Sequence, residues 1–158
     1  GHKQIAYISG PTWKEDSNER LFGHKAALEE EGIEFDEDLL YIGSFLQDSG
    51  SHGLTDLLHT NKPFTALICG NDEMATGAMA MARKLNMDLP NDLSIVGFDN
   101  IIYASYLYPT LTTINYPVLQ MAQMAAQLVL ENVYQIKGLE IKHQFTPKLV
   151  ERNSTRSL

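Results

Sequence analysis

Six side chains that could bind a polar ligand follow short apolar runs along the chain. They comprise a carboxylate, an amide, a guanidinium and three aromatic rings, namely Asp99, Asn71, Arg20, Trp13, Phe45 and Tyr116. A sugar hydroxyl both donates and accepts a hydrogen bond, so an acceptor and a forked donor together fix its orientation. An aromatic face covers the apolar side of a sugar ring. These residue types therefore suit the binding of a neutral polyol.

Each of these side chains also has a purely structural interpretation. Asn71 can cap the helix that follows it, and Asp99 can be an ordinary turn residue. Arg20 can be a solvated or ion-paired residue on a helix surface. Phe45 and Trp13 can pack or lie exposed in loops. The position of the whole set at the ends of apolar runs favours the binding interpretation.

No set of residues has the spacing of a catalytic or metal site. The five histidines show neither HExxH nor another metal-ligand spacing. The segment 70–77 lacks the Gly-Lys-Ser/Thr that ends a phosphate-binding loop. Cys69 is the single cysteine, which excludes an intramolecular disulfide. We therefore expect no enzyme activity, no metal and no cofactor.

Length, charge and composition restrict the class of protein. The chain has 158 residues, and 12 Lys and Arg against 20 Asp and Glu give a formal net charge of −8. This length fits one domain, and a hydrophobic fraction of 44% excludes a disordered chain. No apolar run approaches the ~20 residues of a membrane helix, and no signal peptide precedes the first strand. The acidic balance argues against a direct grip on nucleic acid. We expect a cytoplasmic protein without membrane contact.

Apolar runs that fit buried strands alternate with segments that fit helices. Strands are expected at 5–8, 39–42, 64–69, 93–97, 111–115 and 143–150, and helices at 17–31, 48–60, 73–86 and 117–136. This alternation predicts an α/β fold, a mostly parallel sheet with helices on both faces. In such sheets the ligand crevice lies outside the carboxyl ends of the strands, where the candidate side chains fall. The polar end, 151–158, is expected to be loose.

Six short motifs follow one another along the chain. They are GHKQIAYI at 1–8, NERLFG at 18–23, FTALICGNDEMA at 64–75, LSIVGFDN at 93–100, PTLTTI at 109–114 and LVERNST at 149–155. In this order they resemble the LacI/GalR family of bacterial transcriptional repressors. The resemblance spans nearly the whole chain. Segments 115–117 and 147–150 are most similar to the galactose-type members of that family.

The resemblance implies a periplasmic-binding-protein-like lobe, the C-terminal part of an effector-binding core. Residues 1–116 and 137–158 would form this lobe. The helix 117–136 would pack on a first lobe that lies outside this sequence. The DNA-binding helix-turn-helix head of the family is also absent from these residues, so any contact with operator DNA would be made by that head.

The resemblance also implies roles for individual residues. Arg20, Asn71 and Asp99 match the family's effector-binding polar positions. Phe45 matches a position that often holds an aromatic lid over the ligand. Tyr116 falls where many sugar-binding relatives have Gln, which leaves the identity of the sugar open. The implied ligand is a small sugar, for which a galactose-like hexose is one candidate.

Members of the family form homodimers through this lobe. The matching surfaces are the helix 73–86 and the segment 103–108. The side chains that could fill such a contact are apolar or aromatic, namely Met79, Met81, Tyr103, Tyr106 and Leu107. The same side chains also fit an ordinary core face.

The function implied is that of an effector-sensing and dimerisation domain, in which sugar binding alters the DNA binding of a transcriptional regulator. The alternative is a periplasmic sugar-binding protein of a transport system, which shares the fold but begins with a signal peptide. A phosphotransfer receiver would need an acidic cluster after the first strand. The chain has Ser9 and Gly10 at that point.

Overall fold

The expected strands and helices are all present in the computed structural model, which describes residues 1–158. The strands are β1 (Ile5–Ser9), β2 (Leu40–Ile42), β3 (Ala66–Cys69), β4 (Ser94–Asp99), β5 (Thr112–Asn115) and β6 (Lys148–Val150). The helices are α1 (Glu15–Glu30), α2 (Gln47–His59), α3 (Asp72–Lys84) and α4 (Val118–Asn132), with short 3-10 turns η1 (Glu37–Leu39) and η2 (Ile102–Ser105).

One six-stranded sheet organises the chain, in the order β2-β1-β3-β4-β5-β6. The first five strands pair in parallel, and β6 pairs antiparallel with β5. The chain leaves β1 for the edge strand β2 and then passes back across β1 to β3. The strand order therefore reverses between β1 and β3, and ligand crevices in open α/β sheets form at such a reversal.

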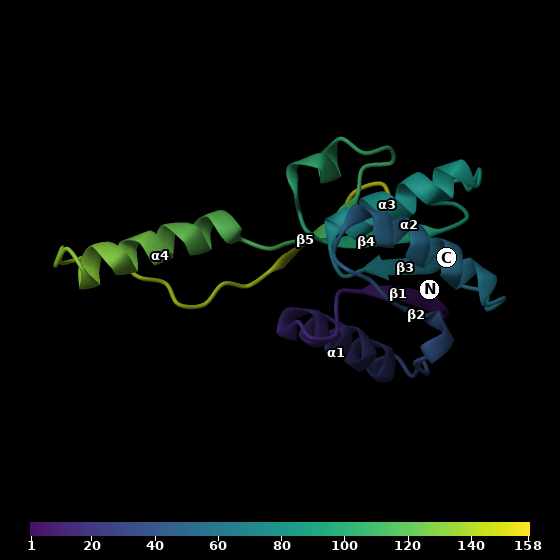
Figure 1. The fold of residues 1–158 in the computed structure, drawn as a ribbon, viewed down its shortest axis with the longest axis horizontal. Coiled ribbons are helices and arrows are strands. Elements are labelled where there is room, and N and C mark those ends of the chain that lie inside the picture. The colour runs from purple at the N-terminus through teal and green to yellow at the C-terminus, as the bar shows by residue number, and fades with distance from the viewer.

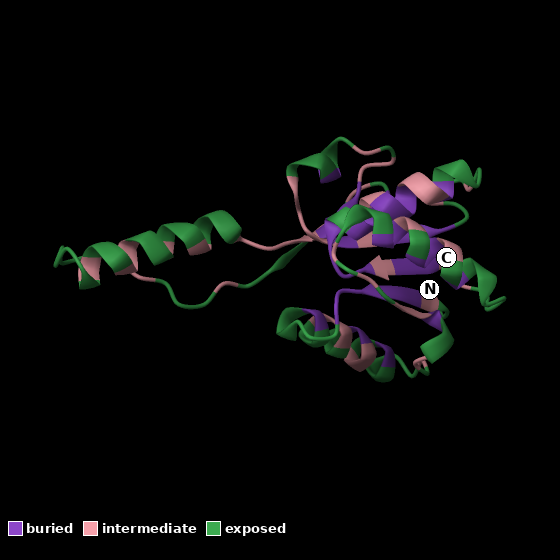
Figure 2. Ribbon diagram, viewed as in Figure 1, coloured by how far each residue is buried: buried purple, intermediate pink, exposed green.

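Helices cover both faces of the sheet, as the alternating pattern predicts. α1 lies on one face, while α2 and α3 pack together on the other (Figure 1). The main core lies between the sheet and these two helices, and its fully buried members include Ile8, Leu54, Leu67, Met74 and Ile95. Figure 2 shows the buried residues gathered in this part of the molecule.

The helix α4 projects from the rest of the chain and carries no buried residue (Figures 1 and 2). It ends at Asn132, before the expected boundary at 136, and the chain then runs back beside it. The expected strand 143–150 is reduced to Lys148–Val150, because only those residues reach a partner strand, at Thr113–Asn115. None of the helices is long and apolar enough to cross a membrane.

The expectation that the segment 151–158 is loose is wrong. Ser154 is fully buried, its Oγ accepts from the N–H of Thr112 at 2.8 Å, and it donates to the carbonyl of Ile95 at 2.6 Å. The N–H of Ile95 in turn donates to the carbonyl of Ser154 at 2.8 Å. A polar segment is therefore held in place because it satisfies backbone groups at the amino ends of β4 and β5.

Candidate ligand-binding cleft

An open cleft of about 670 Å³ lies at the carboxyl ends of β4 and β5. Its polar and aromatic lining residues come from α1, the two strand ends and the segment that leads into α4, and they include Arg20, Asp99, Asn100, Asn115 and Tyr116. Three of the six side chains expected at a binding site therefore meet here, namely Arg20, Asp99 and Tyr116. They meet because parallel strands end at the same edge of a sheet.

The Arg20 side chain extends from α1 to the carboxyl ends of β3 and β4. Its Nη1 donates to the carbonyl of Gly70, which follows β3, at 2.5 Å. The same atom lies 3.7 Å from Oδ1 of Asp99, and Nη2 lies 3.5 Å from Oδ2 of Asp16 one helical turn earlier. The Arg20 side chain is 18% exposed. Three groups of the chain thus lie around the guanidinium, and the Arg20 side chain lines the cleft.

Aromatic rings flank this guanidinium. Its central carbon lies 4.0 Å from the centroid of the Phe98 ring and 5.6 Å from that of Phe45, distances at which a cation is attracted to a ring face. Phe98 also lies beside Tyr116, with ring centroids 6.1 Å apart. The Phe45 ring rests on Gly10, where any side chain would overlap its atoms. The expected aromatic lid position therefore lies over the turn that follows β1.

Asp99 is held in an unusual backbone conformation. Its φ is +117°, and that of the next residue, Asn100, is +57°, a region that side chains other than glycine rarely adopt. Burial raises the pKa of the Asp99 carboxyl to about 6, against the lowering effect of the Arg20 guanidinium. No hydrogen bond within the chain uses this carboxylate, so both of its oxygens remain able to accept from a ligand.

Asn71 has a structural role. Its Oδ1 accepts from the N–H of Met74 at 3.0 Å and so caps α3, and its Nδ2 donates to the carbonyl of Phe45 at 2.9 Å. The side chain is nearly buried and lies outside the residues that line the cleft. Trp13, which is 80% exposed, and Phe45 also lie outside them. Asn71 therefore joins the start of α3 to the loop that carries Phe45.

Sequence reasoning missed the two asparagines of the cleft. Asn100 Nδ2 donates to Oδ1 of Asn115 at 2.9 Å, and the guanidinium of Arg152 donates to Oδ1 of Asn100 at 2.7 Å. Arg152 also donates to the carbonyl of Leu111 at 2.6 Å. The available signal was the position of each asparagine, directly after Asp99 and directly before Tyr116 at adjacent strand ends.

The residues expected at a dimer contact divide into three groups by their exposure. Met79 is 2% exposed and belongs to the core, because the apolar stripe of α3 faces the sheet. The expectation that Met79 contacts a partner is therefore wrong. Met81 and Leu107 are half-buried against that core. Tyr103 and Tyr106 are 60% and 75% exposed. Of the expected set, the two tyrosines present the surface that a partner could reach.

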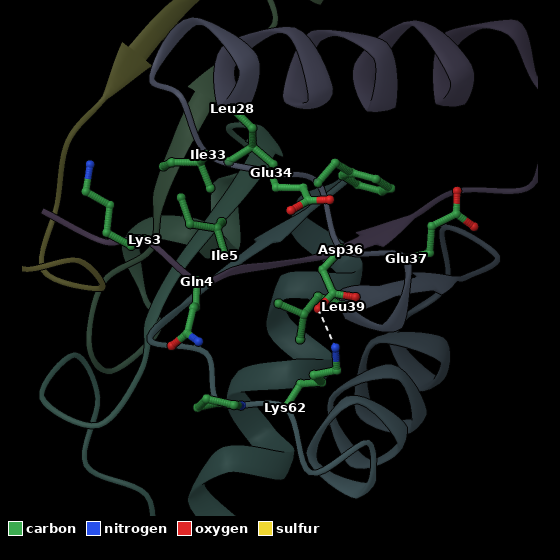
Figure 3. A pocket seen from close by; sticks show the side chains of 12 residues that line it. Lys3, Gln4, Ile5, Leu28, Ile33, Glu34, Asp36, Glu37, Leu39 and Lys62 are labelled. Carbon is green, nitrogen blue, oxygen red and sulfur yellow. Dashed lines mark hydrogen bonds and ion pairs between the residues drawn. The ribbon is translucent and has the colours of Figure 1, made fainter.

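A second pocket, of about 370 Å³, lies at the opposite end of the sheet (Figure 3). Acidic and basic side chains line it together, and Lys62 Nζ lies 2.9 Å from Oδ2 of Asp36 within it. No group of three or more His, Cys, Asp or Glu side chains is arranged to hold a metal ion. Lys62 and Asp36 pair with each other at this pocket, and none of the six side chains expected to bind a ligand lines it, so the cleft at Arg20 and Asp99 remains the candidate site.

The chain matches the periplasmic binding protein-like domain over residues 1–155. The chain belongs to this family. It is 37% identical over 154 residues to the HTH-type transcriptional regulator GalR of Escherichia coli K12. The aligned residues make up 98% of this chain and 45% of GalR. The chain thus spans about half the length of the curated relatives it matches.

Solved structures agree with this assignment. The crystal structure of the Escherichia coli transcriptional repressor AscG has a TM-score of 0.90 and 34% identity, covering 99% of this chain and 57% of that one. The complex of the transcriptional regulator CelR with cellobiose has a TM-score of 0.87 and 30% identity, covering 98% and 47%. The resemblance to the core of a LacI/GalR regulator is therefore confirmed. Transcriptional regulators, the class named for these relatives, are not enzymes.

Proposed function

We propose that the chain is the effector-sensing and dimerisation lobe of a LacI/GalR transcriptional regulator, and that its effector is a small sugar. The observation that carries this proposal is the open pair of Arg20 and Asp99 at the rim of the cleft, 3.7 Å apart and flanked by aromatic rings. A carboxylate and a guanidinium so arranged can accept from and donate to neighbouring hydroxyls of one sugar ring. The complex of CelR with cellobiose supports a sugar ligand.

The roles we assign follow from the geometry of the cleft. Asp99 accepts from a ring hydroxyl, and Arg20 donates to one or two of them through its outer N–H groups. The hydroxyl of Tyr116 and the amide of Asn115 supply further polar contacts, while Phe45 covers the apolar face of the ring. Asn71 acts through the Phe45 loop that it holds, and we assign no contact with the sugar to Trp13, which lies outside the cleft. The similarity to GalR supports a galactose-like hexose as the effector.

We also propose that the cleft is one half of a two-lobed site. Residues 1–116 and 137–158 belong to the present lobe, and the helix at 117–136 reaches across to a second lobe. The exposed apolar side chains of α4 support this arrangement, since Leu119 is 73% and Val118 58% exposed beside the cleft. A sugar bound between the lobes would shift the equilibrium between their open and closed arrangements.

The exposed tyrosines support a homodimer. Tyr103 and Tyr106 lie on and beside η2, directly after the Asp99–Asn100 turn. Met81 and Leu107 would supply the half-buried edge of the contact. Aromatic side chains are enriched at such interfaces. Because η2 follows the ligand-binding turn without a break, a ligand that moves the turn would also move this surface.

In the full protein, sugar binding would change the spacing of two DNA-binding heads and with it the affinity for operator DNA. The formal charge of −8 supports a division in which DNA contact is made by another domain. The protein would act in the cytoplasm, as a binding protein without catalytic activity and without a cofactor.

The reading frame upstream of Gly1 tests this proposal directly. We expect it to encode a helix-turn-helix head of roughly 60 residues followed by a first lobe of roughly 100. A signal peptide followed by a first lobe would instead support a periplasmic transport receptor and contradict the regulatory role.

A further inference from the structure

A carboxylate lies beneath the candidate cleft and takes no part in lining it. Asp72, the first residue of α3, is fully buried. Its Oδ2 accepts from the N–H of Ile101 at 2.9 Å, and its Oδ1 accepts from the hydroxyl of Thr113 at 2.5 Å. Burial raises the pKa of the Asp72 carboxyl, against the lowering effect of these hydrogen bonds. The N–H of Asn100 donates to the same Thr113 hydroxyl, at 3.3 Å. The donors come from β5 and from the turn after β4, so one side chain connects three elements.

The turn held by this carboxylate is the one that presents Asp99. Asp99 and Asn100 have successive positive φ angles, +117° and +57°, which side chains other than glycine adopt only where their surroundings hold them. Of the two N–H groups that follow Asp99, that of Ile101 donates to Asp72 directly, and that of Asn100 donates to the Thr113 hydroxyl, which itself donates to Asp72. Gly97, two residues before Asp99, is required as well, because a side chain there would overlap Oδ1 of Asp72.

We infer that Asp72 is a positioning residue for ligand binding: it holds the turn at Asp99 and Asn100 in its left-handed conformation and so fixes the Asp99 carboxylate relative to Arg20. This inference rests on the proposed function, because it assigns Asp72 a role in the affinity for the sugar. Asp72 does not touch the ligand. It acts through the backbone of the turn and through Thr113.

A purely structural role makes a different prediction. An acidic residue in the first turn of a helix stabilises that helix through the helix dipole. If Asp72 did only this, its replacement would lower the stability of the fold and leave ligand affinity unchanged at temperatures where the protein is folded. Two donors from outside α3, one in the turn after Asp99 and one on β5, favour the positioning role, since a charge that acts only through the helix dipole needs no such donors.

The experiment compares variants of the full-length protein by calorimetric titration with D-galactose, D-glucose and cellobiose. Asp72→Asn keeps the size of the side chain and removes one acceptor, and Thr113→Val removes the hydroxyl between β5 and Asp72. We expect each of these two variants to weaken sugar binding about tenfold or more. Thr113→Ser keeps the hydroxyl and should bind the sugar with wild-type affinity. Leu54→Val, in the core between α2 and the sheet, controls for lost stability and should leave affinity unchanged.

Amide hydrogen exchange gives a second readout that does not depend on the sugar. We expect faster exchange at Asn100 and Ile101 in Asp72→Asn and in Thr113→Val, and wild-type exchange there in Leu54→Val. If Asp72→Asn does not fold, Thr113→Val alone carries the test. Wild-type affinity and exchange in Thr113→Val would overturn the positioning role. A wild-type protein that binds none of the three sugars would overturn the proposed function, and this inference with it.

Discussion

Nη1 of Arg20 lies 3.7 Å from Oδ1 of Asp99, close enough for attraction between charges and too far for a hydrogen bond. That nitrogen already donates to the carbonyl of Gly70. The other N–H groups of Arg20 and both oxygens of Asp99 therefore keep capacity for a third partner. A sugar hydroxyl can satisfy both groups at once, and this relationship underlies the proposed site.

The raised pKa of Asp99 predicts a pH dependence of sugar binding. The carboxyl titrates at about 6, and its ionised form is the better acceptor for a hydroxyl. Affinity should be constant well above pH 6 and fall below it, approaching about tenfold per pH unit. Calorimetric titrations of a hexose across this range measure the slope. Asp99→Asn should bind more weakly than the wild type above pH 6 and should show a flat profile, and a flat wild-type profile would exclude Asp99 from the site.

Gly10→Ala should weaken sugar binding through Phe45. A methyl group at this position would overlap the Phe45 ring, which must then leave its place above the turn. Phe45→Ala should have a similar effect, and the two substitutions together should cost no more than either alone, because they remove the same contact. A double-mutant cycle on affinity measures this coupling.

Gly23→Ala is the matched control for that cycle. Gly23 lies within α1 with open space around its Cα, so alanine should stabilise the helix by about 0.5–1 kcal/mol and leave affinity unchanged. Strictly additive effects of Gly10→Ala and Phe45→Ala would contradict the placement of the ring.

His24 predicts that the fold loses stability in mild acid. Burial, assisted by Lys25, lowers the pKa of His24 from 6.5 to about 4, and its Nε2 has no hydrogen-bond partner. Between these two pH values the unfolded chain binds a proton that the folded chain does not, so stability falls as the pH drops from 6.5 towards 4. Above pH 6.5 His24 is neutral in both the folded and the unfolded chain, so it causes no such loss of stability there.

His24→Phe isolates this effect. The new ring can keep the stacking on Tyr7, whose centroid lies 4.7 Å from that of His24, and it removes the unpartnered nitrogen. The difference in melting temperature between variant and wild type should grow as the pH falls through this window. A difference that is constant with pH would show that His24 does not titrate as its surroundings predict.

Ser154 is expected to be a stability determinant in spite of its position near the end of the chain. Ser154→Ala leaves the N–H of Thr112 and the carbonyl of Ile95 without their partner, which should cost about 1–3 kcal/mol of unfolding free energy. Ser157→Ala, at an exposed position of the same segment, should stay within about 0.5 kcal/mol of wild type. Equal results from denaturant titration of both variants would contradict the anchoring of the segment by Ser154.

Local patterns predicted most of the fold, because hydrophobic runs and helix signals are carried by neighbouring residues. The six expected strands and four expected helices are present, with boundaries shifted by a few residues. The strand 143–150 was predicted too long, since a strand ends where its partner ends. The segment at Ser154 was predicted loose because its anchoring partners, Ile95 and Thr112, are distant in the sequence.

The candidate site was predictable to the extent that it follows from strand ends. Arg20, Asp99 and Tyr116 meet as parallel strands require. The sequence did not indicate that Asn71 is engaged by α3 and the Phe45 loop, that Trp13 lies outside the cleft, or that Met79 faces the core. Each of these depends on the direction of a side chain, which residue type and spacing do not specify.

The most direct test of the account is a calorimetric titration of D-galactose into the full-length protein and its Asp99→Ala variant at neutral pH. We expect the wild type to bind one sugar per protomer and the variant to lose about 1.5–3 kcal/mol of binding free energy, as for a hydrogen bond to a charged group. Equal affinity in the two proteins would contradict the site proposed at Arg20 and Asp99.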